Sequence, residues 1–234
     1  MLRLAVSISL LTIFAGVLCL RLDWLPSLYA FYLFVVGVLA STLLAFTAVA
    51  LICKRLARKQ ALAELPGIAA VCVLPAALVL VLVGPDNFAR PRIHDITTDI
   101  DNPPVFRWAQ AERRPGENSL EYAGAEIAEL QRQAYPDIKT VYLPVSKAQA
   151  WRAVHAVIAQ LGWNILGESQ EEGLLEASDA SPVLGFVDDV AIRVQVLDEG
   201  VLIDLRSVSR IGLGDLGQNA ARIRTFVETL KIYY

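Results

Sequence analysis

The chain has 234 residues, of which 55% are hydrophobic, and its formal net charge is −3. Its mean hydropathy of +0.48 excludes an ordinary soluble globular protein and indicates segments that reside in a membrane. The three cysteines, Cys19, Cys53 and Cys72, all lie in apolar segments. The rest of the chain therefore has no disulfide, no thiol nucleophile and no cysteine ligand for a metal.

Three uncharged runs open the chain, at Leu4–Leu20, Leu25–Cys53 and Gly67–Gly84. Because roughly 20 apolar residues cross a hydrocarbon core about 30 Å thick, we predict three transmembrane helices that contact the lipid bilayer. The first run could instead be a cleaved signal peptide, but a small-x-small cleavage site is absent, so we expect it to be retained. None of the runs contains Asp, Glu, Lys, Arg or His, which favours an anchor over a transport path.

The loop between the second and third runs carries Lys54, Arg55, Arg58 and Lys59. By the positive-inside rule this loop and the N-terminus lie in the cytoplasm, and everything after Gly84 lies outside it. We therefore expect a multi-pass protein of the bacterial inner membrane with a periplasmic or extracellular C-terminal domain. Residues 85–234 carry 15 basic and 22 acidic side chains, which excludes a typical nucleic-acid-binding surface.

Composition divides the chain into three parts: a three-span membrane anchor at 1–84, a Pro-rich connector with a short helix at 85–140, and an α+β domain at 141–234. Prolines remove backbone donors and disfavour helix before them, so we expect an extended connector. Its short helix is predicted at Ser119–Ala134, because Pro136 follows its end.

The last part alternates in a way that predicts strands and helices. Ser146 and Gln149 form a capping box that begins a helix, and Gly162 ends it. The expected elements, in chain order, are a strand at 141–145, this helix, strands at 163–168, 174–178, 190–196 and 201–205, and a helix from about Leu216. With no crossover between parallel strands, this order predicts an antiparallel sheet with helices packed on one face, an α+β fold.

Residues 210–223, RIGLGDLGQNAARI, contain the Gly-x-Gly-x-x-Gly spacing of a dinucleotide-binding loop. That motif needs a second parallel strand after its helix, with an acidic residue for the ribose, and here the helix is the last element. We also expect Asp215 to cap this helix, with Gln218 as its capping-box partner, and a carboxylate there repels phosphate. The glycines therefore predict a tight strand-to-helix turn, and we expect no nucleotide.

The strands on either side of residues 198–200 are expected to form a hairpin. If their apolar faces share one core and the turn is centred on Glu199 and Gly200, Arg193 lies opposite Arg206, and two such arginines repel unless an anion is near. The outer face is then either an exposed salt-bridge ladder or a surface that binds an anion or a partner through arginine forks. The candidate residues for this Asp/Arg surface are Asp188, Asp189, Arg193, Asp204, Arg206, Arg210, Asp215 and Asn219.

One further cluster, His94, Asp95 and Asp99, is a weak candidate for a metal site. A single histidine without cysteines makes zinc a poor fit, the EF-hand pattern is absent, and Asp in a Pro-rich segment usually caps turns. No Walker, GxSxG or HExxH motif and no paired Cys/His is present, so we expect no cofactor and no catalytic residue.

Several separate motifs resemble the family called domain of unknown function 1499, over roughly residues 90–232. They are Ile93–Asp99, Asn102–Pro104, Tyr135–Asp137, Gly185–Arg193, Arg206–Gly212 and Asp215–Ala220. The resemblance implies no established activity, but it favours the polar residues within these motifs as site candidates.

We therefore expect a membrane-anchored extracytoplasmic module without enzymatic activity. It would bind an unknown envelope protein or a small anionic ligand, or organise the envelope, through its Asp/Arg surface. The alternative is an enzyme or a metal-dependent ligand-binding domain in which His94, Asp95 and Asp99 meet the Asp188/Asp189 pair in one cleft.

Overall fold

The computed structural model describes all residues from Met1 to Tyr234 and divides the chain into two compact units. The first unit contains Met1–Ala89 and Val183–Gly185, and the second contains Arg90–Pro182 and Phe186–Tyr234. We refer to the second unit as the globular domain.

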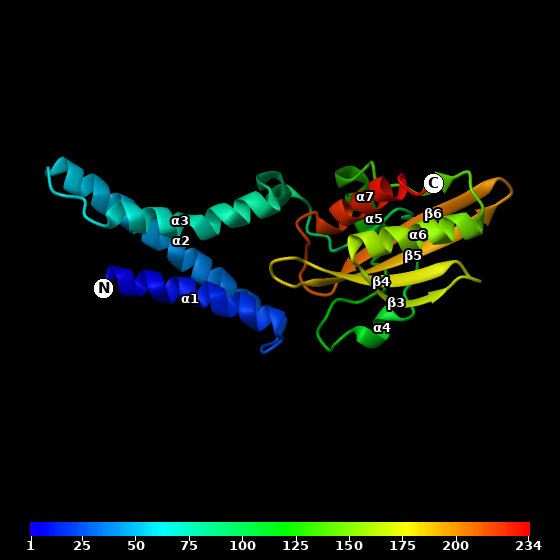
Figure 1. Cartoon of the computed structure of the whole chain (residues 1–234), viewed down its shortest axis with the longest axis horizontal. Helices are drawn as coiled ribbons and strands as arrows, with labels where there is room; N and C mark the ends of the chain where they lie inside the picture. Colours follow the sequence, from blue (N-terminus) through cyan, green and yellow to red (C-terminus); the bar gives the residue numbers. More distant parts are fainter. The chain divides into compact units, whose positions relative to one another are not determined.

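Three helices make up most of the first unit: α1 (Leu2–Arg21), α2 (Ser27–Ala57) and α3 (Leu65–Val83) (Figure 1). All three are long and apolar enough to cross a membrane, which confirms the three predicted helices. A short 3-10 helix, η1 (Pro85–Ala89), follows α3.

Small residues bring these helices close together. A Cβ atom at Gly16 of α1 would lie 2.5 Å from the backbone nitrogen of Phe34 in α2, and one at Gly37 would lie 2.7 Å from that of Ile13. The buried Ser41 hydroxyl of α2 donates a hydrogen bond of 3.0 Å to the carbonyl oxygen of Cys72 in α3. Close backbone contact and internally satisfied hydroxyls are typical of helices packed within a bilayer.

The globular domain is an antiparallel sheet with helices, as the sequence predicts. The strands are β1 (Asp95–Thr97), β2 (Val141–Leu143), β3 (Asn164–Ser169), β4 (Leu174–Ala180), β5 (Val187–Leu197) and β6 (Gly200–Ser209). Their order is β1-β6-β5-β4-β3, and β2 pairs with the first half of β6. The helices are α4 (Ala109–Glu112), α5 (Ala125–Ala134), α6 (Lys147–Leu161) and α7 (Gln218–Leu230).

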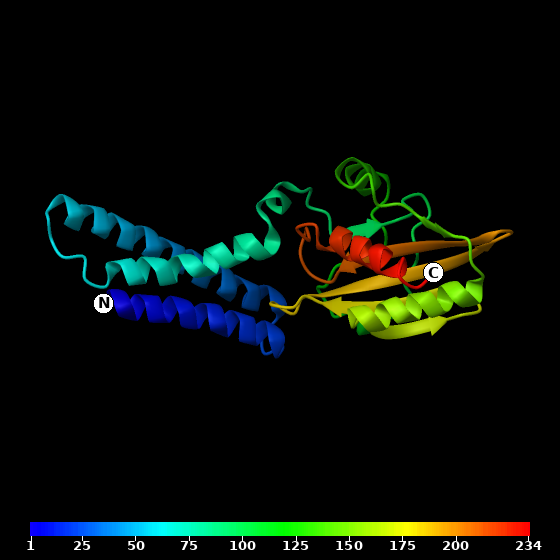
Figure 2. The ribbon, with the colours of Figure 1, turned by 45° about the horizontal axis from the view of Figure 1, so that its top comes forward.

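Helices α6 and α7 lie over the same face of the sheet and share its apolar core (Figure 2). Alternate residues of β5 and β6, including Ile192 and Ile203, point into this core. The capping box of Ser146 and Gln149 begins α6 as predicted, and Gly162 ends it with a φ of +70°. We call this side the helical face.

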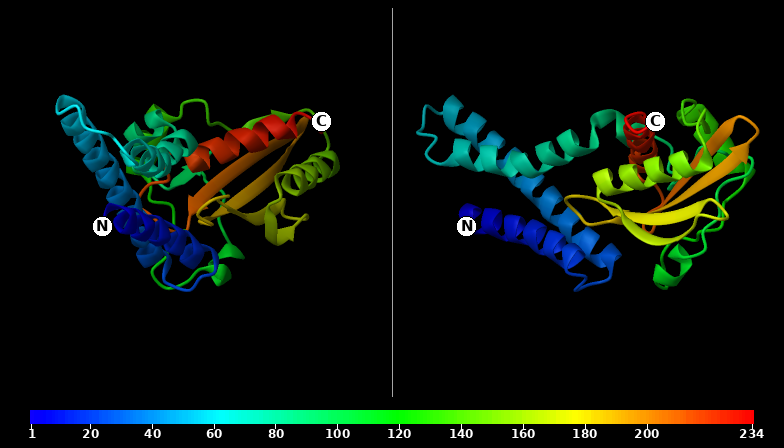
Figure 3. Two further views of the ribbon diagram at one scale, coloured as in Figure 1. Left: turned by 60° about the vertical axis from the view of Figure 1, so that its left-hand side comes forward. Right: turned by 45° about the vertical axis from the view of Figure 1, so that its right-hand side comes forward.

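Residues 98–123, for which we expected an extended connector, lie against the opposite face of the sheet together with α4 (Figure 3). We call them the covering segment. The predicted short helix is confined to α5, because Gly124 precedes it with a φ of +84°. Strand β1 was not predicted, and its outer edge is occupied by a side chain: the Gln131 amide accepts from the Thr97 N–H at 3.0 Å and donates to the Thr97 carbonyl at 2.6 Å.

The register of the β5–β6 hairpin differs from our prediction. Leu197 pairs with Gly200 across a two-residue turn, so Arg193 lies opposite Asp204 and not opposite Arg206. Our turn was centred one residue too late, which slipped the pairing by two residues. The predicted repulsion between two arginines was therefore wrong, since an arginine faces a carboxylate there.

Candidate functional site

A buried ion pair joins Asp95 of β1 to Arg206 of β6 on the face of the sheet that the covering segment lies against. The guanidinium donates to both carboxylate oxygens, at 3.0 and 2.7 Å, and the two side chains are 7% and 2% exposed. Arg206 also donates to the carbonyl oxygens of Pro104 and Leu120. Its bond to Asp95 lies within the sheet, and its bonds to the two carbonyls join the sheet to the covering segment.

A second cluster forms around Asp189 of β5, whose side chain is fully buried. Arg210 donates to it at 2.7 Å, and Arg113 of the covering segment donates at 2.8 Å. Burial lowers the pKa of Arg113, and this lowering exceeds the stabilisation that Asp189 gives to the charged form. One carboxylate thus fixes two arginines from different parts of the chain.

A third cluster joins Arg193 to two carboxylates. Its guanidinium donates to Asp99 at 2.9 Å and to Asp204 at 2.8 Å. Asp204 is buried and also accepts from the hydroxyls of Thr98 and Thr140. The Nε of Arg193 is buried and has no hydrogen-bond partner.

Glu176 of β4 holds the part of the covering segment that leads into α4. Its carboxylate accepts from the backbone N–H groups of Arg107, Trp108 and Ala109. Burial raises its pKa although these three bonds oppose the rise. Beside it, the Trp108 ring packs on Gly167, where a Cβ atom would lie 2.3 Å from the Cγ atom of the indole.

Asp188 lies on the helical face, because successive residues of a strand point to opposite sides. It pairs with Arg222 of α7 at 2.6 Å, and the same guanidinium donates to Asp179 at 2.8 Å. Arg222 also donates to Asn219, whose side-chain oxygen accepts from Ser207. The adjacent Asp188 and Asp189 therefore serve two separate networks on opposite faces.

Asp215 closes the glycine-containing turn before α7. Its carboxylate accepts from the N–H groups of Gly217 at 2.8 Å and Asn219 at 2.7 Å. The helix begins at Gln218 with Gly217 as its N-cap, so our placement of the N-cap at Asp215 was wrong by two residues. The carboxylate nevertheless occupies the N–H groups that a phosphate would need, and burial raises its pKa.

The three weak metal candidates are not brought together. Asp95 pairs with Arg206 and Asp99 with Arg193, while His94 is held through its backbone carbonyl, which accepts from Ser209 and Asn219. No group of three or more His, Cys, Asp or Glu side chains converges on a common point anywhere in the chain.

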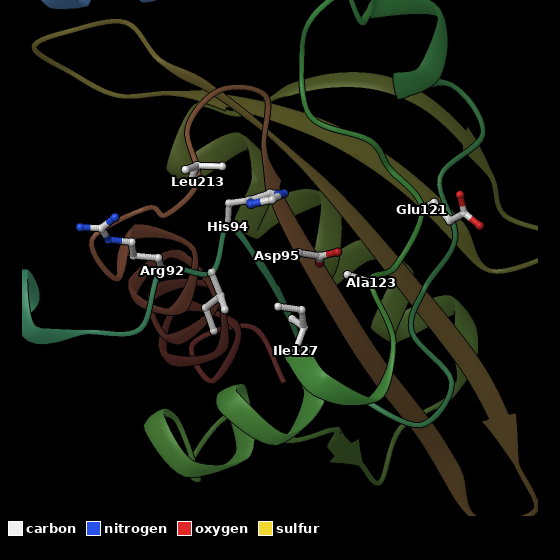
Figure 4. A pocket seen from close by; sticks show the side chains of 8 residues that line it. Arg92, His94, Asp95, Glu121, Ala123, Ile127 and Leu213 are labelled. Carbon is white, nitrogen blue, oxygen red and sulfur yellow. The ribbon is translucent and has the colours of Figure 1, made fainter.

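A cleft of about 350 Å³ opens beside β1 (Figure 4). It is lined by Arg92, Ile93, His94, Asp95, Glu121, Ala123, Ile127 and Leu213. The His94 ring lies between Leu213 and Asp95, whereas the charged ends of Arg92 and Glu121 point away from each other on opposite sides. The cleft thus has a largely apolar lining with a single imidazole in it, a combination suited to an amphipathic ligand.

Tyr122 lies between two cleft-lining residues in the sequence and packs on the guanidinium of Arg206, 5.3 Å from the ring centre. Its hydroxyl is buried without a hydrogen-bond partner. Burial and the nearby Asp95 carboxylate raise the pKa of Tyr122 to about 12. The phenol therefore stays neutral at physiological pH.

Arg113 and Arg222 are important residues that our sequence reasoning missed, and it did not foresee the role of Glu176 as an acceptor for backbone N–H groups. Arg113 lies in an aperiodic Pro-rich segment, and Glu176 alternates with core residues as an exposed residue would. Arg222 carried a usable signal, because it lies on the side of the helix that also carries Ile223 and Phe226, where a lone charge needs a buried partner.

A family model described as "Protein of unknown function (DUF1499)" matches residues 95–230. The match runs from the first residue of β1 to the last residue of α7, and it includes the covering segment and both ionic networks. No curated protein matches the sequence. Because the match covers more than half of the chain, the chain belongs to the DUF1499 family.

Proposed function

We propose that this protein is a membrane-anchored binding module that holds a ligand or an envelope partner in the cleft beside β1, without catalysing a reaction. The observation that carries the proposal is the cleft itself, whose lining includes Asp95, the first residue of β1, and the three residues that precede it. One side of β1 pairs with β6 and the other is closed by Gln131, so this part of the lining is positioned before any ligand arrives.

We assign the Asp/Arg residues a scaffolding role in this function. Asp95, Asp189 and Asp204 are all buried and bound to arginines, so the arginine forks that could take an anion already hold carboxylates. Their contribution is to dock the covering segment, which supplies Glu121 and Ala123 to the cleft. A metal-dependent or enzymatic function has less support, because Asp95 and Asp99 are bound to different arginines.

Photo-crosslinking in living cells tests the cleft. A photoreactive amino acid in place of Ala123, which lines the cleft, should capture a specific adduct that mass spectrometry identifies. The matched control is Ala148, an exposed alanine on α6. We expect the adduct from position 123 alone, and its loss when Ile127→Trp fills the cleft. Equal adducts from both positions, or an adduct that survives Ile127→Trp, would contradict the proposal.

We further propose that the globular domain lies outside the cytoplasm, on the periplasmic or extracellular side of a bacterial inner membrane. The support is the basic loop at residues 54–59 between the second and third helices. Alkaline phosphatase fused after Tyr234 should be active, and a fluorescent protein that folds only in the cytoplasm should stay dark. The reverse pair of results would invert the topology.

A further inference from the structure

The turn that leads into α7 displays large apolar side chains to solvent. Leu213 is 76% exposed and Leu216 is 40% exposed. Leu216 also has a φ of +53°, a left-handed conformation that β-carbon-bearing residues adopt at an energetic cost. The cost of this backbone conformation is not offset by burial of the Leu216 side chain in the core, which points to a role at the surface.

Arg92 belongs to the same surface. A Cβ atom at Gly214 would lie 2.9 Å from the Cα atom of Arg92, so this turn and the chain around Arg92 pack directly on each other. The guanidinium is exposed, forms no ion pair in the structure and points away from the cleft (Figure 4). A free cation thus lines the same apolar cleft as the exposed Leu213, and the exposed Leu216 follows three residues later in the same turn.

The covalent connection limits how far this surface can be from the membrane. Arg92 follows Val83, the last residue of α3, by nine residues, of which five form η1. At about 2 Å per residue in a 3-10 helix and about 3.5 Å per extended residue, the tether spans at most about 25 Å. The tether therefore keeps Arg92 within reach of the bilayer surface, and the lipids there have a high effective concentration around it.

We propose that Leu213, Leu216 and Arg92 form a lipid-contacting surface, and that the adjacent cleft takes part of an anionic phospholipid of the bilayer in which the chain is anchored. The leucines enter the apolar side of the interface and Arg92 pairs with the lipid phosphate. This inference rests on the proposed function, since it names the ligand class of the same cleft.

Tethering and size favour this ligand over a free acidic protein. Residues 85–234 carry more acidic than basic side chains, so the domain as a whole repels any anionic partner, and only one that the tether holds close can use the local attraction around Arg92. The cleft volume of about 350 Å³ is at the small end for a ligand site. Such a cleft accommodates a segment of a lipid whose remainder stays in the membrane.

Quenching by brominated lipid tests the proposal on the full chain in vesicles. Leu213→Trp places a reporter on the surface, in a Trp24→Phe background. The matched control is Val196→Trp, because Val196 is similarly exposed at the tip of the β5–β6 hairpin. Each variant is measured in vesicles of one fixed mixture of phosphatidylcholine and phosphatidylglycerol, with the bromine carried on either lipid.

We expect the position 213 reporter to be quenched more strongly than the control, with a preference of about two- to fivefold for brominated phosphatidylglycerol, as one arginine near a surface implies. Arg92→Gln should abolish that preference. Absence of quenching at position 213, or quenching without preference, would overturn the proposal. The photoreactive residue at position 123 could still capture an adduct that Ile127→Trp removes, while no lipid preference is found. In that case the binding function stands, and only the assignment of the ligand as a lipid is wrong.

Discussion

Loss of Arg206 should destabilise the globular domain far more than loss of an exposed arginine with the same bond geometry. Arg206→Met leaves the Asp95 carboxylate buried without its cation and removes donors from the carbonyl oxygens of Pro104 and Leu120. Breaking a buried ion pair by removing one partner costs about 3–5 kcal/mol. The two carbonyls that lose a donor place the expected cost at the upper end of this range.

Arg224 provides the matched control. It binds Asp137 through two bonds of 2.6 and 2.8 Å, but the two side chains are 41% and 54% exposed. Exposed ion pairs contribute about 0.2–1 kcal/mol, so Arg224→Met should have a small effect. Both arginines make the same type of bond to an aspartate, so the contrast between the variants reports on burial and on the two additional bonds of Arg206 to carbonyl oxygens.

The assay is urea unfolding of the full chain in nanodiscs, followed by tryptophan fluorescence in a Trp24→Phe background. The remaining tryptophans, Trp108, Trp151 and Trp163, all lie in the globular domain. Combining Arg206→Met with Asp95→Leu should recover much of the loss, because it removes the stranded charge. If Arg206→Met costs no more than Arg224→Met, the pair is not desolvated and the covering segment is not docked as described.

Three further predictions concern Gly167, Asp215 and Tyr122. Gly167→Ala should lower the unfolding free energy by about 1–3 kcal/mol, because the new methyl group overlaps the Trp108 ring, whereas an unchanged urea midpoint would show that the indole moves aside without cost. Asp215→Ala should cost about 1–2 kcal/mol by removing the acceptor at the start of α7, and an increase in amide hydrogen exchange confined to that helix turn would verify the cause. Tyr122 ionises near pH 10 when unfolded and has a pKa of about 12 when folded, so its contribution to stability is present below pH 10 and is lost as the pH rises towards 12. Tyr122→Phe should therefore flatten the alkaline fall in stability, and an identical pH profile for the variant would refute this assignment.

The membrane helices and most of the strands could be predicted because each follows from a repeating pattern of apolar residues. The uncharged runs gave the three helices to within a few residues, and the alternation around Ile192 and Ile203 gave the central hairpin. The capping box at Ser146 set the start of α6 for a local reason, a side chain that satisfies nearby backbone donors.

The candidate site could be predicted only in part. The outer face of the sheet is buried by a segment of the chain that has no periodic pattern of apolar residues. The alternation of β5 and β6 indicated an outer face with Arg193 and Arg206, but it could not show that residues 98–123 cover that face. The sequence also left the register of the β5–β6 hairpin open, because its turn could be centred at either of two neighbouring positions. A shift of this centre by one residue changes the partner of Arg193 from a carboxylate to an arginine.

The amide of Gln131 at the edge of β1 has a consequence for the behaviour of many copies in one membrane. Proteins confined to a bilayer collide often, and an open strand edge invites a neighbour to add its own strand and begin aggregation. Gln131 takes up the N–H and carbonyl of Thr97, which such a neighbour would need. A single glutamine thus protects this edge of the sheet against strand addition by a second copy of the chain.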